Sequence, residues 1–309
     1  MKISFLGNFA VDYTSETHHA KSLTTLGHDV VRLQESATST EEISAAAMQS
    51  DLFVWVHTHG WDTPGMSEVL WRLRVAGIPT ATYHLDLWKG LSRERDIRSS
   101  PYWELDHFFT VDKLMADWLT ENTPVKGHYL PAAVFDEDCY ITDEPSQWAN
   151  DVIFVGSKRY HPEWPWRPQL IDWLGATYGQ HFTHIGGDGA SGTLRGHDLN
   201  RAYANCKVAV GDTLCLGFKY PFYASDRLFE APGRGGFQLF PRIHGIPELF
   251  GDTMEFFDYG DFDSLRRLID HYLENDADRE DMRQKCHTLV KTDHTYLNRW
   301  STILDAIWR

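Results

Sequence analysis

The sequence predicts an α/β protein with two domains, each built around a parallel sheet with helices on both faces. Three observations predict this class. Apolar, strand-like runs alternate with helix-like segments, an acidic and irregular stretch at 131–150 interrupts the alternation, and Asp151 restarts it. Strands and helices that alternate at this spacing form a parallel sheet, and 309 residues suffice for two such domains.

The first half contains short apolar runs that predict strands, with helix signals between them. The runs cover residues 2–6, 29–33, 51–56, 78–83, 107–111 and 127–130. Ser39 followed by Glu41 and Glu42 is typical of a capped helix start, and Pro64 and Gly77 bracket another helix. We therefore expect residues 1–140 to form the first domain.

The second half repeats the pattern. Strands are expected at 151–156, 182–185, 207–211, 237–240 and 254–257. From Phe262 the chain has a helical pattern with a break at Asp293, so we expect a second domain over 151–292 and a terminal helical segment over 293–309. Two such domains are Rossmann-like lobes facing a cleft, and their ligands bind beyond the carboxyl ends of the strands.

Composition excludes several classes of protein. The chain has 29 Lys+Arg against 44 Asp+Glu, a net charge of −15, which argues against a general nucleic-acid coat or a membrane-surface protein. No apolar run reaches the ~18 residues of a membrane span, the N-terminal run is too short for a signal peptide, and the 4 cysteines form no C-x-x-C pair. We therefore expect a cytoplasmic protein, in the host cytoplasm if it is encoded by a phage.

The charge is unevenly distributed along the chain. Residues 151–242 carry 10 Lys/Arg against 8 Asp/Glu, whereas the remainder carries 19 against 36. An anionic ligand is therefore most favourable in the second domain.

Two loops of the first domain have polar residues that could face a ligand. Asn8 follows Gly7 after the first strand, but the loop is not a G-x-G-x-x-G motif, so it supports an NAD site only weakly. His57, His59 and Trp61 follow the third strand. Two histidines at this spacing could bind a metal, but no third ligand is evident, so we expect a polar cleft wall and no metal.

The loop after the fourth strand contains the best general-base candidates of the first domain. His84 and Asp86 follow Tyr83 directly, and Trp88 follows them. A histidine and a carboxylate at a strand end can accept a proton in the cleft. The alternative is that the pair only fixes the long loop.

The loop after the first strand of the second domain suits a phosphate. A glycine turn is followed there by two cations, Lys158 and Arg159, and then by Tyr160 and Trp164. The aromatic rings could stack on a planar group or pack at the seam between the domains. The residues expected to contact the anion are Gly156, Ser157, Lys158 and Arg159.

The next two strand ends carry small residues. Gly186 and Gly187 follow the second strand and allow a close backbone approach to a ligand, or form a simple turn. Gly211 and Asp212 end the third strand and resemble a contact on the nucleotide side.

The segment from Tyr223 to Glu230 contains the strongest signal in the sequence. Ser225 or Asp226 caps a helix, and Arg227 in its first turn adds a positive charge for an anion. Glu230 lies one turn further on, where its carboxylate can accept hydrogen bonds from both hydroxyls of a ribose. The alternative is a surface helix with an ordinary arginine.

These residues resemble a known family. The Arg-x-x-Glu … Gly-Gly-Phe block at 226–237 resembles that of two-lobed (GT-B) glycosyltransferases, nearest to the CgeB-like "glycosyl transferases group 1" branch. Supporting blocks lie at 152–157, 259–265 and 294–299. The resemblance is strongest over 151–300, whereas the first lobe matches mainly by layout.

The resemblance implies a role for each of these positions. Glu230 would hold the donor ribose, the helix opening at Ser225 with Arg227, Lys158 and Arg159 would hold the diphosphate, and Gly211 with Asp212 would lie near the nucleoside. The first lobe would hold the acceptor, and the final helices would cross back to it. Retaining members often have a second glutamate eight positions before the ribose glutamate, where this chain has Phe222. Retaining and inverting chemistry therefore both stay open.

We thus expect a hexosyltransferase that uses a nucleotide sugar, with UDP-glucose favoured. His84 or Asp86 would remove the acceptor proton, with His57 or His59 in reserve; Asn8, Trp61, Trp88, Tyr160 and Trp164 would lie on the acceptor side. Similar enzymes occur in phages, where some modify hydroxymethylated DNA bases, so the first acceptor to consider is a 5-hydroxymethylated pyrimidine such as 5-hydroxymethylcytosine. Protein or cell-surface glycan acceptors, a small-molecule acceptor, a nucleotide-sugar epimerase and a non-catalytic binder are the alternatives. A monomer and a homodimer are equally compatible with the sequence.

Overall fold

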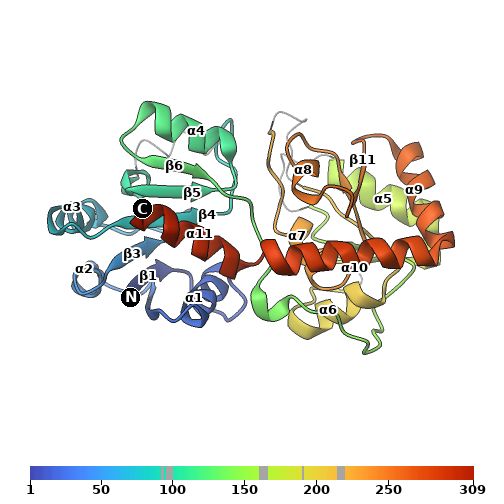
Figure 1. The fold of residues 1–309 in the computed structure, drawn as a ribbon, viewed down its shortest axis with the longest axis horizontal. Coiled ribbons are helices and arrows are strands. Elements are labelled where there is room, and N and C mark those ends of the chain that lie inside the picture. Colours follow the sequence, from blue (N-terminus) through green and yellow to red (C-terminus); the bar gives the residue numbers. More distant parts are fainter. Residues whose placement is uncertain (92–93, 95–99, 160–165, 190, 214–219) are drawn as a thin grey trace. The chain divides into compact units, whose positions relative to one another are not determined.

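The computed structural model describes residues 1–309 apart from 92–93, 95–99, 160–165, 190 and 214–219. The chain divides into two compact units. The first unit contains residues 1–131 and 296–309, and the second contains residues 132–295. Figure 1 shows that each unit is a sheet flanked by helices. The expected α/β class with two Rossmann-like lobes is confirmed.

The sheet of the first unit has six parallel strands in the order β2-β1-β3-β4-β5-β6. These strands are β1 (Lys2–Gly7), β2 (Asp29–Gln34), β3 (Leu52–Trp55), β4 (Thr80–His84), β5 (His107–Thr110) and β6 (Lys126–Tyr129). The helices are α1 (Ser15–Thr25), α2 (Thr40–Ala47), α3 (Met66–Ala76), α4 (Lys113–Asn122), α11 (Tyr296–Trp308) and the 3₁₀ turn η2 (Pro101–Glu104). β1 lies between β2 and β3, so the strand order reverses beside it.

Local signals in the sequence account for the ends of these helices. The Ser39 hydroxyl accepts a hydrogen bond from the Glu42 N–H, and the Glu42 carboxylate accepts one from the Ser39 N–H, so α2 begins with a capping box. Gly77 ends α3 with a φ of 71°, a conformation that glycine adopts without strain.

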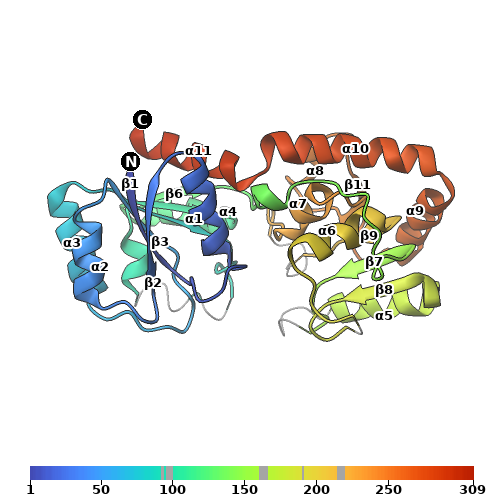
Figure 2. The same ribbon diagram turned by 90° about the horizontal axis from the view of Figure 1, so that it is seen from below.

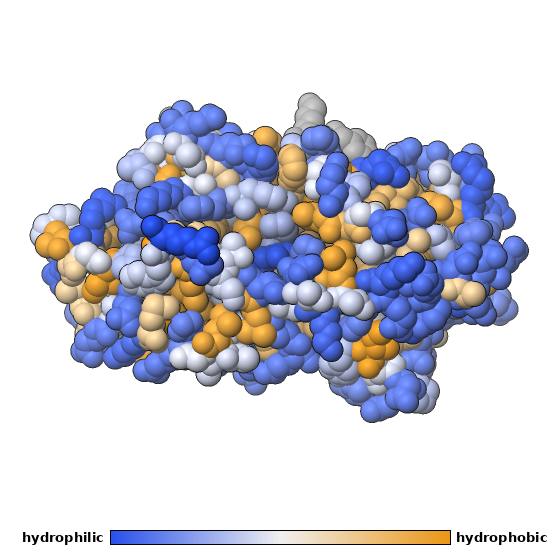
Figure 3. Space-filling model, viewed as in Figure 1, coloured by the Kyte–Doolittle hydropathy of each residue, from blue (hydrophilic) through white to orange (hydrophobic). Residues whose placement is uncertain are grey.

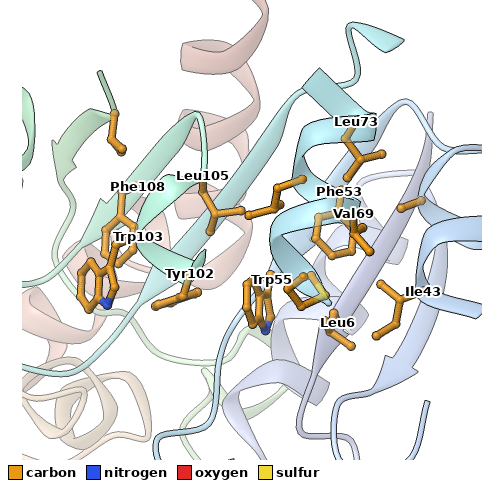
Figure 4. Close-up of a cluster of buried hydrophobic side chains, with 14 of the residues drawn as sticks. Leu6, Ile43, Phe53, Trp55, Val69, Leu73, Tyr102, Trp103, Leu105 and Phe108 are labelled. Atoms are coloured by element: carbon orange, nitrogen blue, oxygen red, sulfur yellow. The ribbon is translucent and has the colours of Figure 1, made fainter. Parts of the chain in front are cut away.

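One core of the first unit lies between the sheet and helices α2, α3 and α4 (Figure 4). All four residues of β3 are buried, which explains why its sequence is a continuous apolar run. Figure 4 shows side chains from the strands, the helices and η2 meeting in this core. The labelled members are Leu6, Ile43, Phe53, Trp55, Val69, Leu73, Tyr102, Trp103, Leu105 and Phe108.

The last helix, α11, returns to the first unit and packs beside α1 (Figures 1 and 2). The ring of Trp300 is fully buried, and its Nε1 donates a hydrogen bond to His19 Nδ1 at 3.2 Å. Burial lowers the pKa of His19 to about 3, so its ring is neutral and can accept this bond. The expectation that the final segment crosses back to the first lobe is confirmed.

The second unit has five parallel strands in the order β11-β10-β9-β7-β8. They are β7 (Val152–Val155), β8 (Phe182–Ile185), β9 (Val208–Val210), β10 (Gln238–Pro241) and β11 (Glu255–Phe257). The helices are α5 (Trp166–Tyr178), α6 (Gly196–Asn205), α7 (Arg227–Gly233), α8 (Pro247–Phe250), α9 (Phe262–Glu274) and α10 (Asp276–Asp293), with short turns η3 (Asp136–Asp138) and η4 (Gly179–His181). α5 and α9 cover one core, α6 covers the other, and α10 packs against α7.

The helical end of the chain has one more break than expected. α9 ends at Glu274, and α10 begins at Asp276. Asn275 lies between them, and its side-chain amide donates a hydrogen bond to the His271 carbonyl at 2.7 Å. Asparagine competes with the helix for backbone hydrogen bonds, so the prediction of a single break at Asp293 was incomplete.

The surface agrees with the polar composition. On the face seen in Figure 3, hydrophilic residues predominate on each unit. In the part of the chain that the structure describes, no helix is long and apolar enough to cross a membrane.

Candidate functional site

In the second unit, β8 and β9 lie on opposite sides of β7, so the loops after these strands diverge at their carboxyl ends. Such a point of reversal is where α/β sheets bind ligands. Gly156 follows β7 with a φ of 145°, and Gly186 follows β8. A Cβ atom on Gly186 would lie 2.4 Å from the Gly156 carbonyl oxygen. Both positions therefore require glycine, so the backbone carries no side chain at these two positions.

Two guanidinium groups lie beside Gly156. A Cβ placed on Gly156 would lie 3.5 Å from Arg227 Nε and 3.6 Å from Arg167 Nη1. Arg167 is only 2% exposed; its Nε donates to Asp212 Oδ2 at 3.2 Å and its Nη1 to the Ser157 carbonyl at 3.2 Å. Two positively charged side chains therefore lie next to the Gly156 backbone, at the point where the strand order reverses.

Arg167 forms a buried ion pair with the carboxylate of Asp212. Burial lowers the pKa of Arg167, and Asp212 opposes that shift while Arg227 adds to it. Burial raises the pKa of Asp212, and the two arginines lower it. Asp212, predicted near a nucleoside, is therefore placed to hold Arg167.

Lys158 and Arg159 are positioned through their backbones. Asp188 accepts hydrogen bonds from the N–H groups of Lys158 at 2.7 Å and Arg159 at 3.0 Å. Although burial opposes it, these two bonds lower the pKa of Asp188. The Lys158 ammonium pairs with Asp172, and Arg159 is exposed. The structure therefore keeps the predicted loop but turns Lys158 toward a carboxylate of α5.

The remaining predicted residues of this edge are spread over three loops. Gly187 is exposed, with Ser157 Oγ 3.6 Å from the position of an added Cβ. Gly211 packs against Phe240, which leaves no room for a Cβ, and Tyr223 is buried. The Ser225 N–H donates to Thr213 Oγ1 at 3.1 Å.

Asp226 and Glu230 lie on α7 close to a buried arginine. Asp226 caps α7 by accepting the Arg227 N–H at 3.0 Å. Glu230 Oε1 lies 3.7 Å from Arg234 Nη2, and Arg234 also bonds Asp138 at 2.5 Å. Burial and Asp226 raise the pKa of Glu230, whereas Arg234 and Arg227 lower it. Glu230 is thus oriented by Arg234 while its side chain stays partly exposed.

In the first unit, a buried carboxylate occupies the edge where the strand order reverses beside β1. Glu35 follows β2, and its carboxylate accepts four hydrogen bonds: from Trp55 Nε1 at 2.8 Å, His57 Nδ1 at 2.5 Å, the Thr58 N–H at 2.8 Å and Thr63 Oγ1 at 3.0 Å. The loop that contains His57 is therefore organised around Glu35.

His84 and Trp88 lie in the core of the first unit. His84 is buried, and its Nδ1 lies 3.0 Å from the Tyr102 hydroxyl. Trp88 is buried against Trp103, with ring centroids 4.9 Å apart. His59 is exposed and meets Trp88 edge to face. The burial of His84 and Trp88 disfavours direct contact with an acceptor at these two positions.

Two further carboxylates belong to the same edge. Asp86 is exposed after β4, whereas Glu16 is buried in the first turn of α1. Burial raises the pKa of Glu16 to about 7, and repulsion from Glu35 and Asp86 adds to the rise. The edge therefore combines the exposed Asp86 with the buried carboxyl groups of Glu16 and Glu35.

The other predicted acceptor-side residues have simpler surroundings. Asn8 is partly buried and its Oδ1 accepts the Ala10 N–H at 3.2 Å, and Trp61 is partly exposed. Tyr160 and Trp164 lie outside the described residues. Within the described ranges, no three His, Cys, Asp or Glu side chains converge as metal ligands.

Sequence reasoning missed Glu16, Glu35, Arg167 and Arg234 as site residues. A signal existed for Glu35, which directly follows a strand, and for Arg167, which opens the helix after β7. Glu16 lies inside an ordinary helical pattern and had no such signal, and Arg234 lies in the glycine-rich turn that follows α7.

The whole chain has the fold of two-lobed glycosyltransferases. The structure of an alpha-glucosyltransferase in complex with UDP-glucose and DNA containing an abasic site matches with a TM-score of 0.69 at 12% identity, covering 100% of both chains. Anabaena Alr3699/HepE in complex with UDP-glucose matches with a TM-score of 0.66 at 14% identity, covering 99% of this chain and 100% of that one. Sucrose-phosphate synthase (tll1590) from Thermosynechococcus elongatus matches with a TM-score of 0.61 at 10% identity, covering 99% of each chain.

The sequence comparison agrees with the fold. Residues 165–305 match the family described as glycosyl transferase-like. No curated protein sequence gives a significant match. The chain therefore has the two-lobed GT-B fold, and its residues 165–305 match a glycosyl transferase-like domain.

Proposed function

We propose that the protein transfers a hexosyl group, with glucose favoured, from a nucleoside diphosphate sugar to an acceptor hydroxyl. The main support for this proposal is that the guanidinium groups of Arg167 and Arg227 both lie beside the backbone of Gly156. Breaking the bond between the sugar and the diphosphate leaves negative charge on the diphosphate. Fixed guanidinium groups stabilise that charge and bind phosphate oxygens in a defined geometry.

Glu230 is the residue we assign to the donor ribose. Its carboxylate is partly exposed, is oriented by Arg234 and lies on the helix that opens with Arg227. A carboxylate there accepts hydrogen bonds from vicinal hydroxyls, which fixes the nucleoside relative to the diphosphate. The alpha-glucosyltransferase and HepE structures, which contain UDP-glucose, support UDP-glucose as the first donor to test.

A 5-hydroxymethylated pyrimidine in DNA is the first acceptor to test. It is supported by the similar alpha-glucosyltransferase, one structure of which contains UDP and a 13-mer DNA with a HMU base. The charge of the first unit favours a second candidate. That unit has 13 Lys/Arg against 18 Asp/Glu, and Asp86 is exposed at its candidate edge, so its charge is unfavourable for a phosphate backbone. An uncharged hydroxyl of a glycan or a protein is compatible with this edge.

One assay separates these possibilities. The protein is incubated with a mixture of nucleotide sugars and either 5-hydroxymethylcytosine DNA or unmodified DNA, and the digested nucleosides are analysed by mass spectrometry. A hexose-sized gain confined to the hydroxymethylated base supports transfer to DNA. Release of nucleoside diphosphate without that gain indicates that the acceptor is a glycan or a protein. The absence of both products from all donors contradicts the transferase.

A further inference from the structure

The structure pairs a histidine with a buried carboxylate at the ligand edge of the first unit. His57 Nδ1 lies 2.5 Å from Glu35 Oε1, and the Glu35 side chain is fully buried. Glu35 comes from the end of β2 and His57 from the loop after β3, with β1 between those strands. The pair therefore lies at the reversal of strand order, which is the preferred ligand position of such a sheet.

The contacts of the pair define which nitrogen of His57 can act. Glu35 as a carboxylate can only accept, so His57 Nδ1 carries the hydrogen and Nε2 keeps a lone pair. Among the residues that the structure describes, none forms a hydrogen bond with Nε2. The ring is held on one side by Trp55, with centroids 5.3 Å apart, and on another by Tyr102, at 5.5 Å. The imidazole is therefore fixed in orientation but retains access to solvent, since its side chain is 13% exposed.

We propose that His57 is the general base for the acceptor hydroxyl and that Glu35 is its positioning residue. This assignment rests on the proposed function. His57 Nε2 takes the hydroxyl proton as the acceptor oxygen bonds to the anomeric carbon. The bond from that carbon to the diphosphate breaks, and the diphosphate leaves with the electron pair. Glu35 stabilises the imidazolium that forms, because a buried carboxylate next to Nδ1 favours the charged ring.

The structure favours His57 over the other predicted bases. His84 is buried and its Nδ1 faces the Tyr102 hydroxyl. His59 is exposed, with its ring on Trp88, and no described carboxylate pairs with it. Asp86 is exposed after β4. Among these candidates, only His57 combines a buried carboxylate partner with an accessible nitrogen.

The variant His57→Asn tests the assignment directly. Its amide can still donate to Glu35, so the loop keeps its main contact, but the nitrogen that takes the proton is lost. We expect kcat for transfer to fall by about 100-fold or more, with UDP binding unchanged. His181→Asn is the matched control, because His181 Nδ1 also pairs with a carboxylate, Asp151, but at the amino end of β7 and β8. It should keep the kcat of the wild type.

Glu35→Gln tests the positioning role through the separate changes in kcat and KM. Without the anion the imidazolium that forms during transfer loses its stabilising partner, so kcat should fall while the KM for the acceptor stays the same. The titratable groups near the pair are Tyr102 from η2, Glu16 from α1 and Asp86 after β4. The Tyr102 hydroxyl bonds Thr82 Oγ1, and burial raises its pKa, so it stays neutral.

Glu16 needs its own variant, because its buried carboxyl group also lies near Glu35. A loss of kcat in Glu16→Gln as large as that in His57→Asn, or a His57→Asn variant as active as an active wild type, overturns the dyad alone. A wild type that transfers no hexose overturns the proposed function with it. His57→Asn leaves the other three hydrogen-bond donors to Glu35 in place, namely Trp55, Thr58 and Thr63. The test with His57→Asn therefore remains valid even if Glu35→Gln does not fold.

Discussion

Arg167 and Asp212 form an ion pair inside the second unit, with Arg167 Nε 3.2 Å from Asp212 Oδ2 and both side chains almost completely buried. One comes from the first turn of α5 and the other follows β9. The pair thereby fixes a cation beside Gly156, where the donor diphosphate is proposed to bind.

Breaking this pair should strongly destabilise the second unit. Asp212→Ala leaves the Arg167 guanidinium buried without its carboxylate, and such a change costs about 3–5 kcal/mol. Urea unfolding measures it. The matched control is Asp281→Ala, which breaks the exposed Lys285–Asp281 pair and should cost less than about 1 kcal/mol. Equal losses in the two variants would contradict the burial argument.

Trp300 should anchor α11 to the first unit. Trp300→Ala removes a fully buried indole and its hydrogen bond to His19, which should cost about 3–5 kcal/mol of unfolding free energy. Trp308→Ala in the same helix is the control, because that ring is 51% exposed and its loss should change stability little. Denaturant unfolding of the two variants compares them, and a harmless Trp300→Ala would show that α11 is not anchored there.

The architecture could be predicted because its signals are local. The buried strands are continuous apolar runs in the sequence. Ser39 and Glu42 form the capping box at the start of α2, and Gly77 ends α3. The site was harder because it depends on strand order. Glu35 follows β2 and His57 follows β3, and these two strands flank β1 in the sheet. The spacing of residues in the sequence does not predict that strand order. The burial of His84 likewise results from η2 folding over its strand.

Glu16 should make stability depend on pH. Its pKa is raised from 4.5 to about 7 in the folded protein, so the folded state holds the proton more tightly. The resulting stabilisation is complete below pH ~4.5 and is lost as pH rises to about 7, by up to about 3 kcal/mol. Glu16→Gln cannot ionise. It should therefore match the wild type near pH 4.5 and be more stable at pH 8.5, as measured by urea unfolding. The same difference at both pH values would contradict the shift.

Glu230 should contribute to binding of the nucleoside but not of the diphosphate. Glu230→Ala removes the proposed acceptor for the ribose hydroxyls, so UDP should bind about 10-fold more weakly or worse. Inorganic pyrophosphate, which has no ribose, should bind at least as well as before, since a negative charge has been removed. Calorimetric titration with both ligands tests this, and a parallel loss for pyrophosphate would place Glu230 elsewhere.

The most direct test of the account is calorimetric titration of the wild type, Arg227→Gln and Arg266→Gln with UDP. Arg227 lies beside Gly156, whereas Arg266 is exposed on α9. We predict that the wild type and Arg266→Gln bind UDP equally and that Arg227→Gln binds at least about 10-fold more weakly, since a hydrogen bond to a charged group is lost. A wild type that does not bind UDP, or an Arg227→Gln variant that binds it as well as the wild type, would contradict the proposed donor site.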